Sequence, residues 1–542
     1  MPMRHAPTIL IGLVSCVFSS GPPPVRAVVV TTSEQVHPVL IGKAHNALLR
    51  VVVDLQREDD VRLRSMHFDL GGTDDVGDVE SLELFTTGDR QGFSPDAGFG
   101  DPRPASHRVA FRGDQTLQRG PNVFWLSCRL KPTADLLHRV GASCTVVQTS
   151  AGRLLPGSSS PPVGHRIGVA LRQHNEGGVH THRLPVLATT PTGTLLCGYD
   201  MRWRGAKDMQ ADIDIGLSRS TDGGRTWEPV RVIVDMGEYG GLPQEQNGCS
   251  VPGIVVDQQT GDVFCFTGWM HGKPGLDQWG AGGSEPGHEI GRSAQVLMVR
   301  SKDDGRTWSR PENLTRKLKK ADWRLLSPAP QQGINLPDGT LVLPVEGLAA
   351  KGTEFSSIMT SRDHGATWSV ASPLSAEAPD RFGGECQAVQ LGDGSIMLNM
   401  RTEKRSEHER FRAVFVTRDL GRTWQPHETN LNTLIDPHCN ASLLRVDYTE
   451  AGEKKHVLLF ANPHSRKNRT HQTIQVSFDD GRTWPEAHHL LLDEGRGWGY
   501  ASLSRVDDGH IGIAYEGSQA DIVFEKVPLK ELLGAAAGNQ RQ

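Results

Sequence analysis

The octapeptide STDGGRTW at residues 220–227 recurs four times along the chain. The other copies are SKDDGRTW at 301–308, SRDHGATW at 361–368, TRDLGRTW at 417–424 and SFDDGRTW at 477–484. Successive copies start 81, 60, 56 and 60 residues apart. This period fits one four-stranded antiparallel sheet per copy, and sheets repeated in this way close into β-propellers. The repeat therefore predicts an all-β propeller over the second two thirds of the chain.

Each octapeptide has the composition of a hairpin turn. The aspartate can accept hydrogen bonds from backbone amides, the glycine supplies a positive φ, and the threonine and tryptophan anchor the turn to its sheet. The aspartates are also candidates for catalytic carboxylates or calcium ligands, but identical chemistry in five repeats favours a structural role. They are Asp222, Asp303, Asp363, Asp419 and Asp479.

A second repeat places a tight turn before an apolar strand in each unit. The segments are PTGTLLCGYD, QTGDVFCFTG, PDGTLVLPVE, GDGSIMLNMR and DDGHIGIAYE. Glu346, Arg401 and Glu516 each lie seven residues after the turn glycine, and Arg202 lies nine after its own. Charged groups at strand ends are costly if buried without partners. They indicate a shared polar cavity at one end of the propeller axis; the alternative is a rim that faces water.

The composition excludes some classes of function. The chain has 542 residues, 37 % of them hydrophobic, with 60 glycines, 33 prolines and a net charge of −5. This length favours more than one folding unit, and the glycine and proline content favours turn-rich β structure. Because the chain is not polybasic, no nucleic-acid partner is expected.

Residues 1–27 have the layout of a secretory signal. A positive charge precedes the apolar run Ile9–Phe18, and Val25 and Ala27 stand where a signal peptidase expects small residues, so cleavage is predicted after Ala27. Ten apolar residues cannot span a bilayer, so no transmembrane segment is predicted. The mature chain is expected to begin near Val28 and to be secreted or periplasmic. The alternative is a lipoprotein signal that leaves a lipid anchor on Cys16.

Seven cysteines follow the predicted signal, an odd number without CxxC spacing. This pattern favours buried apolar thiols, with one or two bridges at most, over a zinc site or a dense disulfide framework. Cys249 and Cys265 are the nearest pair in sequence and the first candidates for a bridge. His180 and His182 have no third ligand beside them, so neither a metal nor a cofactor is expected.

Residues 28–160 lack the octapeptide and show a different pattern. Apolar and polar residues alternate at 61–70 and 121–130, as in half-buried strands. A β-sandwich over 28–160 fits this alternation, and SSSPPVG at 158–164 is the expected linker.

Six further motifs complete the pattern of the propeller region. They are HRLP (182–185), DMRWRGAKD (200–208), ECQAVQ (385–390), LNMR (398–401), NRTHQTI (468–474) and GWGYASL (497–503). With the five octapeptides, called Asp-boxes, this ordered set resembles the bacterial exo-α-sialidases. The resemblance implies a six-bladed propeller over 165–530, one blade of which has no recognisable box. Residues 28–160 resemble the N-terminal module that accompanies some sialidases.

The resemblance implies an arginine clamp. A sialic acid carries a carboxylate on its anomeric carbon, and guanidinium groups bind carboxylates through charge-assisted, often bidentate hydrogen bonds. The implied clamp is Arg183, Arg401 and Arg469. Arg466 is a poorer candidate for its third member. Glu516 would orient Arg183, and Arg202 would contact substituents of the sugar ring.

The same resemblance implies a catalytic set. The substrate carboxylate repels an anionic nucleophile, and sialidases use a tyrosine instead of a second carboxylate. Tyr500 would be the nucleophile, and because the pKa of a free tyrosine is near 10, Glu385 would take its proton. Asp208 would protonate the departing oxygen and then deprotonate water. Rival candidates are Asp212 and Asp214 for the acid and Tyr515 for the nucleophile.

These motifs predict a retaining exo-α-sialidase that removes terminal sialic acid from glycoproteins, glycolipids or oligosaccharides. A lectin-like propeller that binds sialosides without cleaving them, or a trans-sialidase, is the alternative. Val251 stands where many relatives carry an aspartate, so a different substrate preference is expected. Trp269 is expected to line the pocket.

Overall fold

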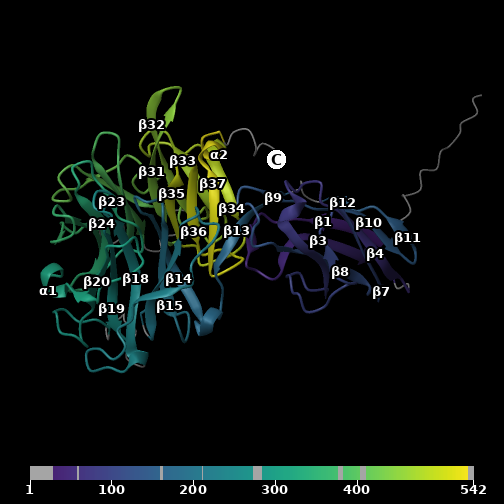
Figure 1. Cartoon of the computed structure of the whole chain (residues 1–542), viewed down its shortest axis with the longest axis horizontal. Coiled ribbons are helices and arrows are strands. Elements are labelled where there is room, and N and C mark those ends of the chain that lie inside the picture. Colours follow the sequence, from purple (N-terminus) through teal and green to yellow (C-terminus); the bar gives the residue numbers. More distant parts are fainter. Residues whose placement is uncertain are drawn as a thin grey trace, which may run out of the picture.

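The computed structural model of the chain, shown in Figure 1, describes residues 28–57, 60–158, 163–209, 211–272, 283–375, 382–402 and 410–534. These residues form two β-rich bodies that lie side by side, an N-terminal one in purple and a larger one running from blue to yellow. The predicted signal segment, with Cys16, lies outside the described residues. No helix within these ranges is long and apolar enough to cross a membrane.

The N-terminal body contains two sheets. One holds, in spatial order, β12 (Gly157–Ser158), β1 (Val28–Ser33), β3 (Asn46–Leu55), β8 (Gly120–Leu130), β5 (Val79–Gly88) and β6 (Arg103–Pro104). The other holds β11 (Gly152–Leu154), β10 (Ser143–Thr149), β4 (Arg62–Asp69) and β7 (Arg108–Thr116). Phe124 of the first sheet and Phe68 and Phe111 of the second lie in one buried apolar cluster. Burial of alternate side chains along the strands therefore joins the two sheets.

The larger body consists of antiparallel units that follow one another along the chain. The first unit contains β14 (Thr181–Thr189), β15 (Leu195–Arg202), β16 (Ile213–Ser220) and β17 (Arg231–Val234). The second contains β18 (Asn247–Val256), β19 (Val263–His271), β20 (Gln295–Ser301) and β21 (Glu312–Asn313). A single bridge between β16 and β18 links the two units. The third unit contains β22 (Leu325–Pro328), β23 (Ile334–Asn335), β24 (Leu341–Leu348), β25 (Glu354–Ser361) and β26 (Ser369–Val370). The fourth contains β27 (Phe382–Gln390), β28 (Ile396–Thr402), β29 (Ala413–Thr417) and β30 (Gln425–Pro426). The fifth is β31 (Ser442–Glu450), β32 (Glu453–Pro463), β33 (Gln472–Ser477), β34 (His489–Asp493).

The last sheet joins distant parts of the chain. It contains β35 (Ala501–Asp507), β36 (His510–Tyr515), β37 (Ile522–Pro528) and β13 (His165–Arg172), with β2 (Val39–Ile41) and β9 (Arg139–Val140) also paired to β13. Two short helices, α1 (Thr315–Leu318) and α2 (Leu529–Leu533), lie outside the sheets. Because β2 and β9 come from the N-terminal part, this sheet ties the two bodies together.

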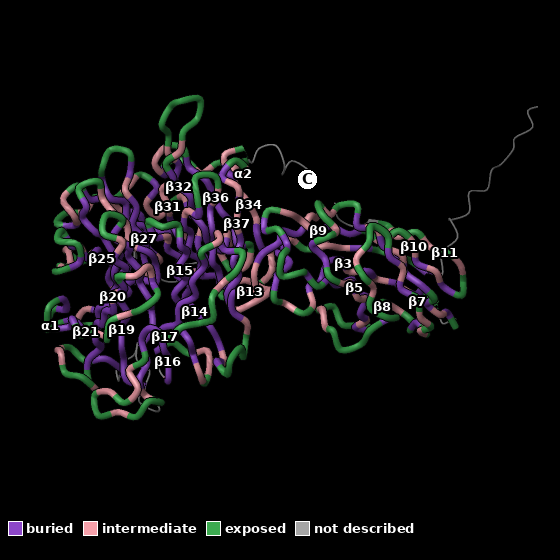
Figure 2. The backbone as a smooth tube through the Cα atoms, viewed as in Figure 1, coloured by how far each residue is buried: buried purple, intermediate pink, exposed green. Residues whose placement is uncertain are grey.

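Most strands of the larger body are covered on both faces. Every residue of β15 and β19 is buried, including apolar residues at consecutive positions. Figure 2 shows this as buried strands inside a border of exposed loops. Strands at the start of successive units contact one another in chain order, from β14 through β18, β23, β27 and β31 to β35, and β35 contacts β14.

All five Asp-boxes form the predicted turns between the last two strands of their units. In the second box, Asp303 Oδ1 accepts the backbone N–H of Thr307 at 2.8 Å and Oδ2 accepts its hydroxyl at 2.6 Å. Hydrogen bonds from Thr307, and others from Ser301 and Arg306, lower the pKa of Asp303 to about 2. The other four aspartates make the same contacts with their own threonines. The structural interpretation of these aspartates is confirmed.

The cysteine prediction is partly wrong. All seven cysteines after residue 27 are free thiols, and six of them are buried. Cys249 pairs in register with Trp269, and Cys265 with Ile254, so the expected bridge between the two cysteines does not form. Proximity in sequence failed here because the strand register places the two residues at different heights.

Replacing Asp303 by alanine should lower the free energy of unfolding by about 1–3 kcal/mol, because three hydrogen bonds of one turn are lost. The neighbouring Lys302→Ala, which removes an exposed side chain of the same turn, is the control and should change it by less than ~0.5 kcal/mol. Urea denaturation compares the two. Equal losses in both variants would contradict the assigned role of the carboxylate.

Candidate active site

A cavity of about 260 Å³ opens where second strands of the units end. Glu346 and Arg401, near the ends of β24 and β28, line it. Arg202, at the end of β15, reaches it through an ion pair with the lining residue Asp208. Glu516, directly after β36, binds the backbone beside it. The predicted polar cavity is confirmed for Glu346 and Arg401, whereas Arg202 and Glu516 do not line it but contact residues that do.

Backbone irregularities position several of the lining side chains. β14, β18 and β27 each shift register beside the cavity. A bulge re-aims the side chains next to it, and Leu184, Val251 and Glu385, each within such a shift, all line the cavity. Leu184 and Val251 have φ values of 58° and 64°, a conformation that is strained for a β-branched valine. The strands therefore depart from regular geometry where they meet the site.

Arg183 and Glu516 form a buried ion pair behind the cavity. Arg183 Nε lies 2.6 Å from Glu516 Oε1, and the two side chains are 5 % and 0 % exposed. The same carboxylate accepts the backbone N–H groups of Leu184 at 2.8 Å and Tyr500 at 3.1 Å. Burial disfavours the charge of Arg183, but the carboxylate of Glu516 outweighs burial and raises the pKa of Arg183. The guanidinium is thus charged and held in one orientation.

Arg202 connects two carboxylates of very different exposure. Its Nε and Nη2 donate to Asp200 Oδ2 at 3.1 and 2.9 Å, and its Nη1 lies 2.5 Å from Asp208 Oδ1. The Asp200 side chain is fully buried, whereas that of Asp208 is 53 % exposed. Desolvation would raise the pKa of Asp208, but the guanidinium groups of Arg202 and Arg183 lower it below its ordinary value. Asp208 is therefore an ionised carboxylate that solvent and ligands can reach.

Tyr500 lies between a carboxylate and a guanidinium. Its hydroxyl donates to Glu385 Oε1 and accepts from Arg401 Nη1 at 3.1 Å, and Arg401 Nη1 also binds Glu385 Oε2. Desolvation and the charge of Glu385 raise the pKa of Tyr500 well above 10. Desolvation opposes the charge of Glu385 too, but Arg401 and the tyrosine hydroxyl lower the pKa of this carboxyl. Glu385 is thus an ionised acceptor for a phenolic proton.

Two cations flank the Tyr500 ring. The guanidinium carbons of Arg183 and Arg469 lie 5.3 and 5.4 Å from its centroid, within cation–π range. Arg469 is held by the carbonyls of Trp498 and His438, both at 2.9 Å. Three arginines, Arg183, Arg401 and Arg469, therefore surround one phenol.

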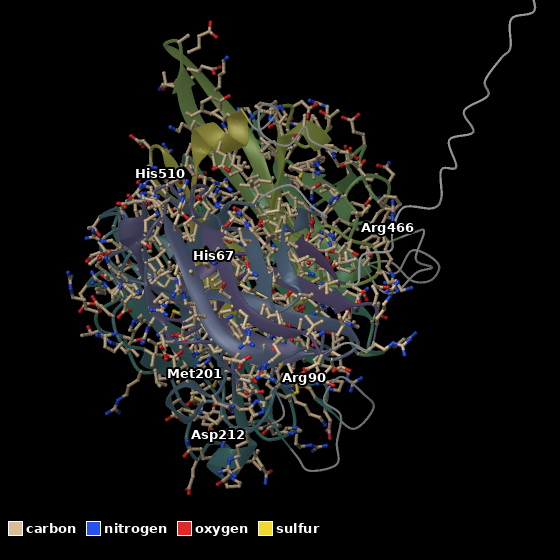
Figure 3. All side chains as sticks on the ribbon, turned by 90° about the vertical axis from the view of Figure 1, so that its right-hand side faces the viewer. His67, Arg90, Met201, Asp212, Arg466 and His510 are labelled. Atoms are coloured by element: carbon tan, nitrogen blue, oxygen red, sulfur yellow. The ribbon has the colours of Figure 1, made fainter. Side chains whose placement is uncertain are left out.

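The rival residues lie elsewhere. Arg466 stacks on Phe411, 4.3 Å from the ring centroid, and Figure 3 shows Arg466 and Asp212 at separate edges of the molecule. Asp214 accepts the indole N–H of Trp203, and Tyr515 donates to Glu525 at 2.7 Å in another cluster. None of these residues lines the cavity.

The expectation that Trp269 lines the pocket is wrong. Its ring is fully buried in the core of the first two units, where its indole N–H donates to Asn247 at 2.9 Å. The strand β19 presents this residue to the neighbouring sheet and not to the cavity.

Sequence reasoning placed Glu346 at the cavity but gave it no chemical role, and it assigned nothing to Asp200 and Trp498. Glu346 lines the cavity and is buried; desolvation and the charges of Glu385 and Glu354 raise its pKa well above 4.5. Its seven-residue spacing from the turn glycine was the available signal. Asp200 and Trp498 lie inside quoted motifs, but nothing in the motifs distinguishes a positioning carboxylate or a wall residue. Across the described part of the chain, no group of three histidine, cysteine or carboxylate side chains could hold a metal.

Two family models and several known proteins match this chain over most of its length. The model for the BNR repeat-like domain matches residues 193–513, and that for the N-terminal domain of BNR-repeat neuraminidase matches 27–98 and 101–152. A sialidase of Bacteroides fragilis is 35 % identical over 523 residues, which are 92 % of this chain and 94 % of the relative. The chain belongs to the sialidase family. It is thus a glycoside hydrolase.

Further relatives of this sialidase support the assignment. A sialidase of Micromonospora viridifaciens is 31 % identical over 399 residues, 72 % of this chain and 58 % of the relative. The solved structure of a Hadza microbial sialidase superposes with a TM-score of 0.84 at 34 % identity, covering 92 % of this chain and 99 % of the other. The likeness therefore includes both bodies of the fold.

In the site of this sialidase, the positive side chains and the acidic side chains occupy different positions around Tyr500. Arginines lie behind and beside Tyr500, and Glu346 and Glu354 line the cavity with Glu385. Such a site can bind an anion next to a hydroxyl that has its own proton acceptor.

Replacing Glu516 by alanine should lower the free energy of unfolding by about 3–5 kcal/mol, because it leaves a buried guanidinium without its partner. Glu245→Ala is the matched control, since Glu245 forms an exposed pair with Arg204, worth less than ~1 kcal/mol. Thermal and urea denaturation measure both. A Glu516 variant as stable as the control would show that the ion pair does not hold the site together.

Proposed function

We propose that this sialidase is a retaining exo-α-sialidase that hydrolyses terminal sialic acids of glycoproteins, glycolipids or oligosaccharides through a tyrosine nucleophile. The observation that carries the proposal is the hydrogen bond from the Tyr500 hydroxyl to Glu385, with the guanidinium groups of Arg183, Arg401 and Arg469 around the ring. The arginines supply the fixed positive charge that a sialic acid carboxylate needs. A protein that only bound sialosides would have no use for the tyrosine–carboxylate pair.

We infer the architecture around this site to be a six-bladed propeller over 165–530, preceded by a β-sandwich module over 28–160. Five antiparallel units, a last sheet closed by β13 and the contact of β35 with β14 support this inference. Closing the last sheet with a strand from the start of the repeat region removes its exposed edge. The proposed mature chain begins near Val28 and is secreted or periplasmic, with a lipid on Cys16 as the alternative.

In the proposed first step, Tyr500 Oη forms a bond to the anomeric carbon while its proton passes to Glu385. Asp208 gives a proton to the glycosidic oxygen as the bond from that oxygen to the anomeric carbon breaks. In the second step Asp208 takes a proton from water, and the water oxygen bonds to the anomeric carbon as the bond from that carbon to Tyr500 Oη breaks. Glu385 then returns its proton to the tyrosine oxygen. Two displacements give an α product with retained configuration.

Asp208 must be protonated for the first step, although it is ionised in the empty site. The charges of Arg202, Arg183 and Arg401 lower its pKa. A substrate carboxylate bound by the clamp offsets the charges of Arg183 and Arg401. Binding therefore raises the pKa of Asp208 and favours its protonated form. Arg202 itself is held by Asp200 and contributes a constant charge on the other side.

The decisive experiment follows the anomer released from an aryl α-sialoside and from sialyllactose by NMR. The wild type should release the α anomer first. Tyr500→Phe should lose about 10³-fold or more in kcat, with binding by the arginines largely kept. Asp208→Asn should lose about 10²–10⁴-fold on sialyllactose but far less on the aryl substrate, whose leaving group needs no proton.

The alternatives give other outcomes in the same experiment. Near-wild-type turnover of Tyr500→Phe removes Tyr500 from the nucleophile role. A wild type that binds sialic acid but cleaves neither substrate is a lectin. Transfer to added lactose in place of water indicates a trans-sialidase.

Glu346 should make substrate binding pH-dependent. Its raised pKa keeps the carboxyl neutral at acidic pH. Desolvation and the charges of Glu385, Glu354 and Asp208 raise the pKa, and Arg401 opposes them. As pH rises through this pKa, a negative charge appears in the cavity and repels the anionic substrate, so KM should rise severalfold. In Glu346→Gln that rise should be absent, because the amide stays neutral. A KM profile identical to that of the wild type would contradict this role of Glu346; surface Glu245→Gln is the control.

A further inference from the structure

A second, larger cavity of about 940 Å³ adjoins the site. We call it the Trp498 groove. Five loops form it: those after β13, before β31, between β32 and β33, between β34 and β35, and between β36 and β37. The residues that matter for its chemistry are His174, Lys467, Arg469, Arg496, Trp498 and Asp521.

The groove shares its wall with the active site. Arg469 lines the groove and also lies over the Tyr500 ring. The Trp498 ring packs on the Arg183 guanidinium, 4.4 Å from its centroid, and is still 46 % exposed. A ligand whose carboxylate lies on Arg183 and Arg469 therefore has the groove as adjoining open space. The exposed indole offers a flat apolar surface on which a sugar ring can rest.

The groove is basic although the whole chain carries a net charge of −5. Lys467, Arg469 and Arg496 contribute three basic side chains to its lining, and Asp521 is the one acidic residue among the described lining residues. Asp521 accepts the backbone N–H of His182 at 2.9 Å and faces the His174 ring, so its charge is directed to groups of the protein. The positive charge is thus a local property of this groove.

The clamp does not account for all of this charge. Arg183, Arg401 and Arg469 suffice for one carboxylate, while Lys467 and Arg496 belong to loops beyond the Tyr500 ring. Arg496 is exposed, and its side chain makes no ion pair or hydrogen bond with the described residues. Its guanidinium is available for a carboxylate or a sulfate ester, which it can bind bidentately.

We propose that the Trp498 groove binds the sugar on the leaving-group side of the scissile bond, and that this sugar carries an anion. The anionic group is a carboxylate, as in a second sialic acid, or a sulfate ester. The proposal rests on the proposed function, because it takes the clamp and Tyr500 as the site that holds the terminal sialic acid. It adds that the preferred substrates of this sialidase are acidic glycans with charge on both sides of the bond.

The test compares kcat/KM on four substrates with the same terminal sialic acid. They are an aryl α-sialoside, sialyllactose, disialyllactose and a sialyllactose with a sulfate on its galactose. The wild type should favour one or both anionic substrates over sialyllactose by about tenfold, and rising salt should weaken the preference. A response to disialyllactose alone identifies a carboxylate site, and one to the sulfated substrate alone a sulfate site.

The double variant Lys467→Gln with Arg496→Gln should remove this preference. It should lose about tenfold on the anionic substrates and stay within about twofold of the wild type on the aryl sialoside and sialyllactose. Arg466→Gln is the matched control, because Arg466 precedes Lys467 but packs on Phe411 and does not line the groove. It should leave all four values unchanged.

Other results overturn the proposal. If the wild type shows no preference for the anionic substrates, the groove does not recognise a charge on the leaving sugar. An equal loss on all four substrates in the double variant leads to the same conclusion. A wild type inert on the aryl sialoside overturns the proposed function instead, and the groove proposal with it.

Discussion

The ion pair between Arg183 and Glu516 is the interaction on which the rest of the site depends. One carboxylate binds the guanidinium of β14 and the backbone N–H groups of Leu184 and Tyr500. It thereby fixes the Arg183 guanidinium and the hydroxyl-bearing residue Tyr500 relative to each other. Because β14 begins the first unit and Glu516 follows β36 of the last, the same contact joins units that are remote in sequence. The contact that orients the side chains of the site is therefore also one that holds the first and last units together.

When several arginines lie near one phenol, each guanidinium needs its own neighbouring group to compensate its charge. Arg183 has Glu516, Arg202 has Asp200 and Arg401 has Glu385, in each case within hydrogen-bond distance. Arg469 instead relies on two backbone carbonyls, which carry only partial charges. Its positive charge is therefore the least compensated of the four and is directed to both the active site and the Trp498 groove. This arrangement makes the clamp attractive to an anion without making the empty site unstable.

The sequence predicted those features that depend on local chemistry. The Asp-box turns follow from residues within eight positions, and the convergence of Arg401 and Glu346 follows from their equal spacing after a turn. The sequence did not predict features that depend on how neighbouring strands pair. The bulge that turns Val251 into the cavity and the register that separates Cys249 from Cys265 depend on neighbouring strands. For Trp269, a strand end next to the cavity did not reveal which face of the sheet the ring occupies.

The electrostatics of the empty site constrain the order of events in the proposed mechanism. Arg401 and Arg469 lower the pKa of Tyr500, while desolvation and Glu385 keep it well above 10. A substrate carboxylate on these arginines offsets their charge, so binding raises the pKa of Tyr500 further. A free phenolate is therefore less accessible in the complex than in the empty site. The tyrosine proton must then move to Glu385 as the bond to the anomeric carbon forms, which is why this carboxylate needs both its lowered pKa and its direct contact with the hydroxyl.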